Sequence, residues 1–129
     1  MTQDRRTGRK DRRLALRVPA VFAVKSFLRG RVQLGQAEDL APGGMTLRRL
    51  PELPAHIGTA ITLTFALPDE TGSGLLRVSG VVVSDCVAGT FRRTGVRFAA
   101  LPNEVQQRIS RFCTSGLVEA YTDAALSTA

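Results

Sequence analysis

Hydrophobic and polar residues alternate along most of the chain after residue 17. The clearest case is 61–67, where every second residue is large and apolar and the residues between are threonine or alanine. A period of two is typical of a strand with one buried face. Runs rich in β-branched and aromatic residues predict further strands at 18–28, 31–40, 44–50, 75–86 and 90–98. Turn-forming segments separate these runs, so the pattern indicates an antiparallel barrel or sandwich rather than alternating β–α units.

One helix is predicted near the C-terminus. Three apolar residues recur at helical spacing on one face, namely Val105, Ile109 and Phe112. Asn103 is a residue type that favours the N-cap position of a helix. Gly116 is a residue type that often follows the end of a helix. We therefore expect a helix over about 104–113 that closes one end of the barrel. Residues 115–129 are expected to form a C-terminal tail, either a frayed end or a short helix for oligomer contact.

The charge is concentrated at the N-terminus. The chain of 129 residues carries 18 basic and 11 acidic side chains, a formal net charge of +7. Seven of the basic and two of the acidic residues lie in 1–17, so this arm alone carries +5. The length is near that of a single domain. We divide the chain into a flexible basic arm at 1–17, a barrel plus helix at 18–114, and the tail.

Composition excludes several classes of protein. No apolar run approaches the 18 or so residues of a membrane span, and the charged N-terminus does not resemble a secretory signal. Cys86 and Cys113 lack the spacing of metal ligands or of a disulfide scaffold, so we expect a reducing cytoplasm. The single histidine, His56, lies in a turn-like run with no nucleophile beside it, so we expect a solvated loop residue and no enzymatic activity.

Two short segments carry the functional signal. The first is an RRxxxR run, Arg12-Arg13-Leu14-Ala15-Leu16-Arg17, directly before the first strand. The second is Asp39-Leu40-Ala41-Pro42-Gly43-Gly44, between the second and third strands. Together they resemble the PilZ domain family, whose signature is RxxxR followed by [D/N]xSxxG. The resemblance covers roughly 9–114. It implies a six-stranded antiparallel β-barrel followed by a C-terminal α-helix.

The resemblance also implies a ligand, since PilZ domains are receptors for the bacterial second messenger cyclic di-GMP. Arg13 and Arg17, assisted by Arg12, would hold its phosphates and guanines. Guanidinium groups suit this role because they bind phosphate oxygens and guanine edges in a bidentate manner and stack on purines. Asp39 can accept the N–H donors of a guanine edge. Gly43 and Gly44 would let a base approach the backbone closely.

The arginine register is ambiguous in the sequence alone. Arg5, Arg9, Arg13 and Arg17 recur every four residues, so other pairs also satisfy RxxxR. We assign the motif to Arg13 and Arg17 because this pair adjoins the first strand. Ligand binding would order the arm across the barrel and change the surface shown to a regulatory partner protein, which the sequence does not identify.

One position departs from the family pattern, because Ala41 stands where the family has serine. Loss of one hydrogen bond to a polar or charged partner costs about 1–3 kcal/mol. Two interpretations follow: a receptor that still binds cyclic di-GMP, or a degenerate PilZ-like module that binds a protein without nucleotide. A nucleic-acid-binding barrel is a third. The lack of tryptophan and of a paired aromatic platform for base stacking argues against it.

Several other residues receive structural interpretations. We expect Arg48 and Arg49, and likewise Arg92 and Arg93, to lie on solvated strand faces, with the two members of each pair on opposite faces. Gly80 would mark a bulge or bend. The remaining expectations concern burial: the two cysteines are expected to be partly buried, and the core to include Phe22, Phe65 and Phe98.

Overall fold

The computed structural model describes residues 18–67 and 74–128, with side chains described through Ser115. It contains seven strands and one long helix within those residues. These elements are β1 (Val18–Pro19), β2 (Ala23–Leu28), β3 (Arg31–Ala41), β4 (Gly44–Arg49), β5 (Ala60–Phe65), β6 (Leu76–Ala88), β7 (Phe91–Phe98) and α2 (Asn103–Thr128). The turn-forming segment between the predicted strands at 61–67 and 75–86 lies mostly outside the described residues.

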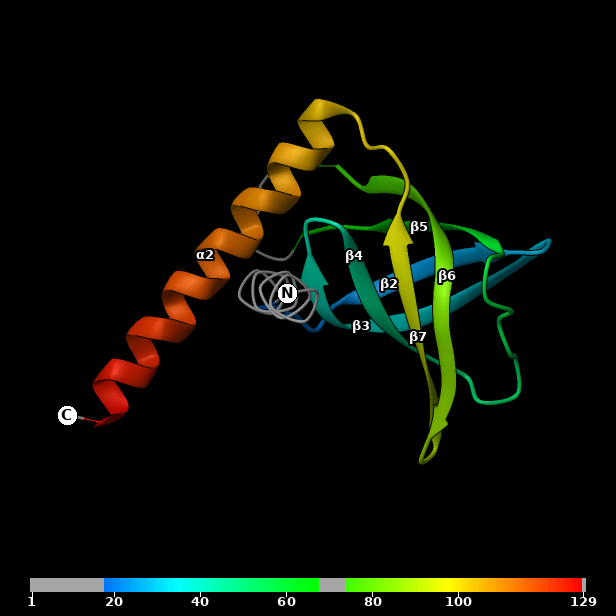
Figure 1. The fold of residues 1–129 in the computed structure, drawn as a ribbon, viewed down its shortest axis with the longest axis horizontal. Coiled ribbons are helices and arrows are strands. Elements are labelled where there is room, and N and C mark those ends of the chain that lie inside the picture. The colour runs from blue at the N-terminus through cyan, green and yellow to red at the C-terminus, as the bar shows by residue number, and fades with distance from the viewer. Residues whose placement is uncertain (1–17, 68–73, 129) are drawn as a thin grey trace, which may run out of the picture.

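Six of the strands close into an antiparallel barrel (Figure 1). The order around it is β3-β2-β5-β6-β7-β4, and β4 pairs again with β3 to complete the circle. The predicted class, all-β with one helix in a six-stranded antiparallel barrel, is therefore confirmed. β1 is an additional short strand that pairs with the end of β3.

The predicted first strand, 18–28, is divided into β1 and β2. Strand β1 pairs with residues 39 and 40 of β3, whereas β2 pairs with residues 31–36. Between these two stretches, β3 carries a register shift between Ala37 and Asp39. An extra residue in β3 changes the register there, so β1 and β2 pair with β3 in registers that differ by one residue. Hydrogen bonds from Ala20 N–H to Glu38 O and from Ala37 N–H to Phe22 O still join the segment between β1 and β2 to β3.

Alternation along each strand fills the barrel interior with apolar side chains, as the sequence predicts. In β5, Ile61, Leu63 and Phe65 are all at most 1% exposed. Phe98 is buried as well, and Phe22 packs against the core with its ring centroid 5.4 Å from that of Phe65. Burying a large apolar side chain stabilises the fold by about 1.5–3 kcal/mol, so these residues supply much of the driving force.

Helix α2 covers one end of the barrel. Its residues Ile109 and Cys113 are fully buried, and Val105 and Phe112 pack against the same core. The helix contacts β1 and β3, and its later turns continue away from the barrel (Figure 1). The predicted apolar face is therefore confirmed. Its start is confirmed to within one residue, because Gln106 N–H donates the first helical hydrogen bond to Pro102 O at 2.9 Å.

The predicted end of the helix is wrong, because α2 passes through Gly116 and continues to Thr128. A glycine inside a helix costs only about 1 kcal/mol relative to alanine. The residues that follow Gly116 include several alanines and two leucines, which are good helix formers. Glycine alone is therefore a weak stop signal when helical sequence continues beyond it.

The opposite end of the barrel interior is polar. Arg49 and Arg92 point inward, where Arg92 Nη1 donates to Asp85 Oδ2 at 2.8 Å and Arg49 Nη1 lies 3.8 Å from Asp85 Oδ1. Thr94 Oγ1 donates to the same carboxylate at 2.7 Å and accepts from Arg49 Nη1 at 3.2 Å. The expectation of solvated faces is wrong for these two arginines, while Arg48 and Arg93 are exposed on the other face.

Gly80 and Cys86 also differ from what the sequence predicts. The register shift in β6 lies between Val82 and Ser84, not at Gly80. A Cβ at Gly80 would lie 2.7 Å from Arg97 O, so Gly80 permits close strand packing. Cys86 is exposed rather than partly buried, and Cys113 is fully buried.

Candidate functional site

The Asp39–Gly44 segment forms the connection between β3 and β4. Ala41 pairs with Gly44, which leaves Pro42 and Gly43 as a two-residue turn. Strand β7 holds this turn from the other side, because Phe98 N–H donates to Gly43 O at 2.8 Å and Gly44 pairs with Arg97. The turn is therefore fixed in place by backbone hydrogen bonds.

The two glycines of the turn have different roles. A Cβ on Gly44 would collide with the carbonyl oxygen of Val96, so the barrel itself requires glycine there. Among the described residues, no atom lies within 4 Å of a Cβ placed on Gly43, and Gly43 is exposed. The space above Gly43 is thus open to a molecule that approaches the backbone.

A β-bulge gives Asp39 its position. Ala37 and Leu40 are buried, while the two residues between them, Glu38 and Asp39, are both partly exposed. Regular alternation would turn one of these neighbouring carboxylates into the core. The register shift between Ala37 and Asp39 allows both to reach the barrel surface. The sequence alone does not reveal this bulge.

The start of the described chain lies beside the turn. Val18 pairs with Leu40, and Pro19 pairs with Asp39. Val18 follows the RRxxxR run directly, so this pairing brings the residue after Arg17 next to the second motif. The remaining predicted site residues, Arg12, Arg13 and Arg17, lie outside the described residues. Of the candidate site, the structure thus places Asp39 near the end of β3, Gly43 in the β3–β4 turn and Gly44 at the start of β4.

A row of small side chains crosses the barrel surface from Asp39. Asp39 pairs with Thr46 of β4, Thr46 pairs with Gly95 of β7, and Gly95 pairs with Ser84 of β6. Arg97 is exposed two residues further along β7, at the register position of Gly44. The sequence alone does not place Arg97 in the site, because only the β4–β7 pairing brings it beside the turn.

A second charged cluster borders this row. Glu38 accepts hydrogen bonds from Arg48 Nε at 2.7 Å and from Arg93 Nε at 2.8 Å. The guanidinium carbons of Arg48 and Arg93 lie 4.3 and 5.5 Å from the centre of the Phe91 ring. The pKa of Glu38 is lowered chiefly by the hydrogen bond from Arg93; burial opposes this shift, and Arg48 adds to it. These contacts hold two arginines in fixed directions beside the row.

The match to a family model decides the classification. The model of the PilZ domain matches residues 8–115, which include both motifs, all seven strands and the first half of α2. The chain belongs to the PilZ family.

Solved PilZ structures share this fold at low sequence identity. The inhibitor of motility MotI (DgrA) of Bacillus subtilis matches 80% of this chain with a TM-score of 0.73 and 17% identity. The PilZ domain of YcgR from Escherichia coli, solved with c-di-GMP, matches 84% with a TM-score of 0.63 and 19% identity. The MrkH–c-di-GMP complex of K. pneumonia matches 83% with a TM-score of 0.65 and 16% identity.

These comparisons differ in how much of the other protein is covered. The match spans 50% of MotI and 53% of MrkH, but 94% of the YcgR PilZ domain. The chain therefore corresponds to about half of the larger proteins and to nearly all of a single PilZ domain. No curated protein sequence matches the chain significantly.

In the described part of the chain, the His, Cys, Asp and Glu side chains form no group of three that could hold a metal ion. No helix there combines the length and the hydropathy required to cross a bilayer. The candidate site consists of the Asp39–Gly44 segment and the row of small side chains from Asp39 to Ser84.

Proposed function

We propose that this PilZ domain is a non-enzymatic receptor for cyclic di-GMP that regulates a partner protein. One observation carries the proposal: the family match spans both motifs, and β1, which follows the arginine run, pairs with Asp39 and Leu40 of the second motif. The two motifs are separated by 21 residues between Arg17 and Asp39, yet strand pairing brings the chain after the first beside the second.

The chemistry of the described residues fits a guanine nucleotide. Asp39 lies on the partly exposed barrel surface, where its carboxylate can accept hydrogen bonds from the N1–H and N2–H donors of guanine. Gly43 leaves the backbone open for a purine to approach. The small side chains of the row from Asp39 to Ser84 leave a shallow surface on which a flat base can lie.

Cations are available on both sides of this surface. Arg97 is exposed next to Gly44, and Arg93 is held at the other side by Glu38. The basic arm would supply Arg12, Arg13 and Arg17 to the phosphates and to the faces of the bases. Charge-assisted hydrogen bonds from guanidinium to phosphate are stronger than neutral ones, so the arm would contribute much of the affinity.

Regulation would follow from the position of the arm. An arm that closes over the ligand changes the surface beside β1, β3 and α2. A ligand shifts the population of a conformation only by its difference in affinity for the two states, so the partner must distinguish the closed arm from the open one. MotI of Bacillus subtilis, which shares this fold, is an inhibitor of motility.

Isothermal titration of the protein with cyclic di-GMP, with GTP as a control ligand, tests the proposal. We expect saturable binding of cyclic di-GMP and no comparable signal with GTP. Asp39→Ala should weaken binding at least tenfold, while Asp39→Asn should retain most of it, because the family motif accepts either residue. Glu104→Ala removes an exposed carboxylate at the start of α2 and should have no effect.

The opposite outcome has a specific meaning. If the titration of the wild-type protein is flat and an independent assay confirms the absence of binding, the receptor hypothesis is wrong. Ala41 would then mark a lost nucleotide site, and the domain would act as a protein-interaction module without a nucleotide.

A further inference from the structure

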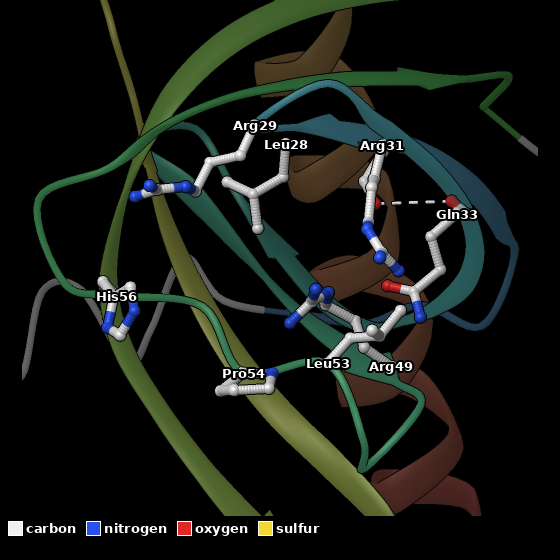
Figure 2. A pocket seen from close by; sticks show the side chains of 9 residues that line it. Leu28, Arg29, Arg31, Gln33, Arg49, Leu53, Pro54 and His56 are labelled. Carbon is white, nitrogen blue, oxygen red and sulfur yellow. Dashed lines mark hydrogen bonds between the residues drawn. The ribbon is translucent and has the colours of Figure 1, made fainter.

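A polar cavity lies at the barrel end that α2 does not cover. A cavity of about 300 Å³ is formed there by the end of β2, the beginning of β3, the end of β4 and the segment 53–56 (Figure 2). Cavities of this size accept small organic ligands. Gln33 of the cavity and Ala41 of the β3–β4 turn are eight residues apart on β3, which corresponds to roughly 25 Å along the strand. The cavity is therefore separate from the proposed messenger site.

The floor of the cavity contains a buried amide. Gln33 is 9% exposed, and neither its Oε1 nor its Nε2 forms a hydrogen bond with any described residue. Its backbone carbonyl accepts a hydrogen bond from Ser26 Oγ at 3.3 Å, which helps to fix the strand beneath the side chain. A buried polar group without a partner costs about 1–3 kcal/mol. An amide in this position offers an NH2 donor group and a carbonyl acceptor to a molecule in the cavity.

Arg49 adds a buried guanidinium group to the lining of the cavity. It is 5% exposed, and its Nε forms no hydrogen bond with the described residues. Its Nη1 is directed to Thr94 and Asp85, so the group is held in a fixed orientation. Figure 2 shows Arg49, Gln33 and Arg31 converging on one part of the cavity, with Arg29 and His56 on the other side.

The charges around the cavity favour an anion. Its lining includes three arginines and one histidine but no carboxylate. The nearest acid of the buried cluster, Asp85, is shared between Arg49 and Arg92, so the cluster keeps an excess of one positive charge. Burial lowers the pKa of Arg49, with Asp85 opposing and Arg92 adding to the shift. An anion beside Arg49 would offset the energetic cost of burying its positive charge.

The walls of the cavity are anchored. Asp85 Oδ2 accepts a hydrogen bond from Ala55 N–H at 3.1 Å, and Arg92 donates to Pro51 O at 2.9 and 3.2 Å. These bonds fix the segment after β4 that forms one side of the site. The donor groups are therefore preorganised, which reduces the entropic cost of binding.

We propose that this cavity binds a small oxyanion, the phosphate or carboxylate group of a small metabolite, through Arg49, Arg31 and Gln33. The guanidinium groups would hold the oxyanion, and the Gln33 amide would bind a neighbouring hydroxyl or a further anion oxygen. The site is independent of the arm and of cyclic di-GMP, so the domain would respond to a second chemical signal.

A titration followed by ¹⁵N NMR tests this inference on the full chain. Sodium phosphate is the first probe and sodium succinate the second, each against sodium chloride at equal ionic strength. We expect saturable shifts of the backbone amides of Ser26, Gln33 and Ala55 and of Arg49 Nε–H. The probe with the tighter dissociation constant identifies the phosphate or the carboxylate as the preferred group.

Variants distinguish binding in the cavity from nonspecific attraction of anions to the basic protein. Gln33→Leu removes the amide with little change in volume, and Arg31→Ser removes an exposed cation at the cavity. Each should weaken the saturable shifts about tenfold. Arg77→Ser is the matched control, because it removes one exposed arginine that does not line this cavity. Arg13→Ala/Arg17→Ala should leave the cavity shifts unchanged even where it abolishes binding of cyclic di-GMP.

Two results would overturn the inference. The first is the absence of saturation with both probes up to about 20 mM. The second is a set of shifts that follows ionic strength alone, or that decreases equally in Arg31→Ser and Arg77→Ser. Either result would leave Gln33 and Arg49 with a structural role only.

Discussion

Residues of the Asp39–Gly44 turn are held in place for different reasons. Gly44 is required by the close approach of Val96 O, whereas no residue in the described part of the chain packs over Gly43. Ala41 is 8% exposed, at the end of β3. A hydroxyl at Ala41 would add a donor beside the proposed ligand surface without a large change in volume. The effect of the missing serine can therefore be measured directly.

Ala41→Ser should strengthen the binding of cyclic di-GMP by about 5- to 100-fold, which corresponds to one added hydrogen bond to a polar or charged group. Thermal stability should change little. The measurement is a titration beside Ala23→Ser, which adds a hydroxyl at an exposed position of β2 and should leave the affinity unchanged. Equal affinities of all three proteins would show that position 41 does not contact the ligand.

The two cysteines differ in burial, so they can be compared to test how burial affects the pKa of a thiol. Burial raises the pKa of Cys113 from 9.0 to about 11, while Cys86 is exposed. Below pH 9 the thiol is protonated in both the folded and the unfolded chain. Between pH 9 and 11 the unfolded chain loses this proton while the folded chain keeps it. The stabilising contribution is therefore complete below pH 9 and is lost as the pH rises to 11.

Urea unfolding at pH 8 to 11 tests this linkage. The Cys113 thiol should lower the free energy of unfolding by at most about 1.4 kcal/mol for each pH unit above 9. The slope should be smaller in Cys113→Ala, whereas Cys86→Ser should keep the slope of the wild-type protein. Identical slopes in all three proteins would contradict the assigned cause.

At the scale of elements, alternation along the chain predicts where the strands run but not how they join. The side chains of 61–67 alternate strictly, and β5 forms there. The bulge in β3 and the division of 18–28 into two strands depend on pairing between distant segments, which local patterns do not encode. Charged side chains are expected to be exposed to solvent, and the sequence gives no reason to expect otherwise for Arg49, Asp85 and Arg92. Only closure of the barrel places these three side chains together inside it.

Asp85 connects β6, β7 and the segment after β4, so its removal should affect stability strongly. Asp85→Ala leaves Arg49 and Arg92 buried without their carboxylate and removes the acceptor of Ala55 N–H. We expect a loss of about 3–5 kcal/mol in the free energy of unfolding. Urea unfolding measures this loss, with Glu104→Ala as the control. A substitution at an exposed position such as Glu104 lowers the free energy of unfolding by less than about 0.5 kcal/mol. A similar small loss in both variants would contradict this account of the polar end.

At the scale of the whole molecule, the two ends of the barrel differ in chemistry. The end at β1 and the β3–β4 turn is closed by the apolar face of α2 and lies next to the basic arm in the sequence. The other end holds the polar cavity. The resemblance of Asp39–Gly44 to the PilZ signature predicts Asp39, Gly43 and Gly44 as members of one site. Arg97 requires knowledge of the β4–β7 register, and the roles of Arg12, Arg13 and Arg17 remain predictions.

The central claim is that Arg13 and Arg17 of the arm, with Asp39, bind cyclic di-GMP. The most direct test is calorimetric titration of Arg13→Ala/Arg17→Ala beside Arg5→Ala/Arg9→Ala, which has the same spacing and the same loss of charge. We predict that the first variant loses saturable binding and that the second binds within a few-fold of the wild-type protein. Equal losses in both variants, or no binding by the wild-type protein, would contradict the claim.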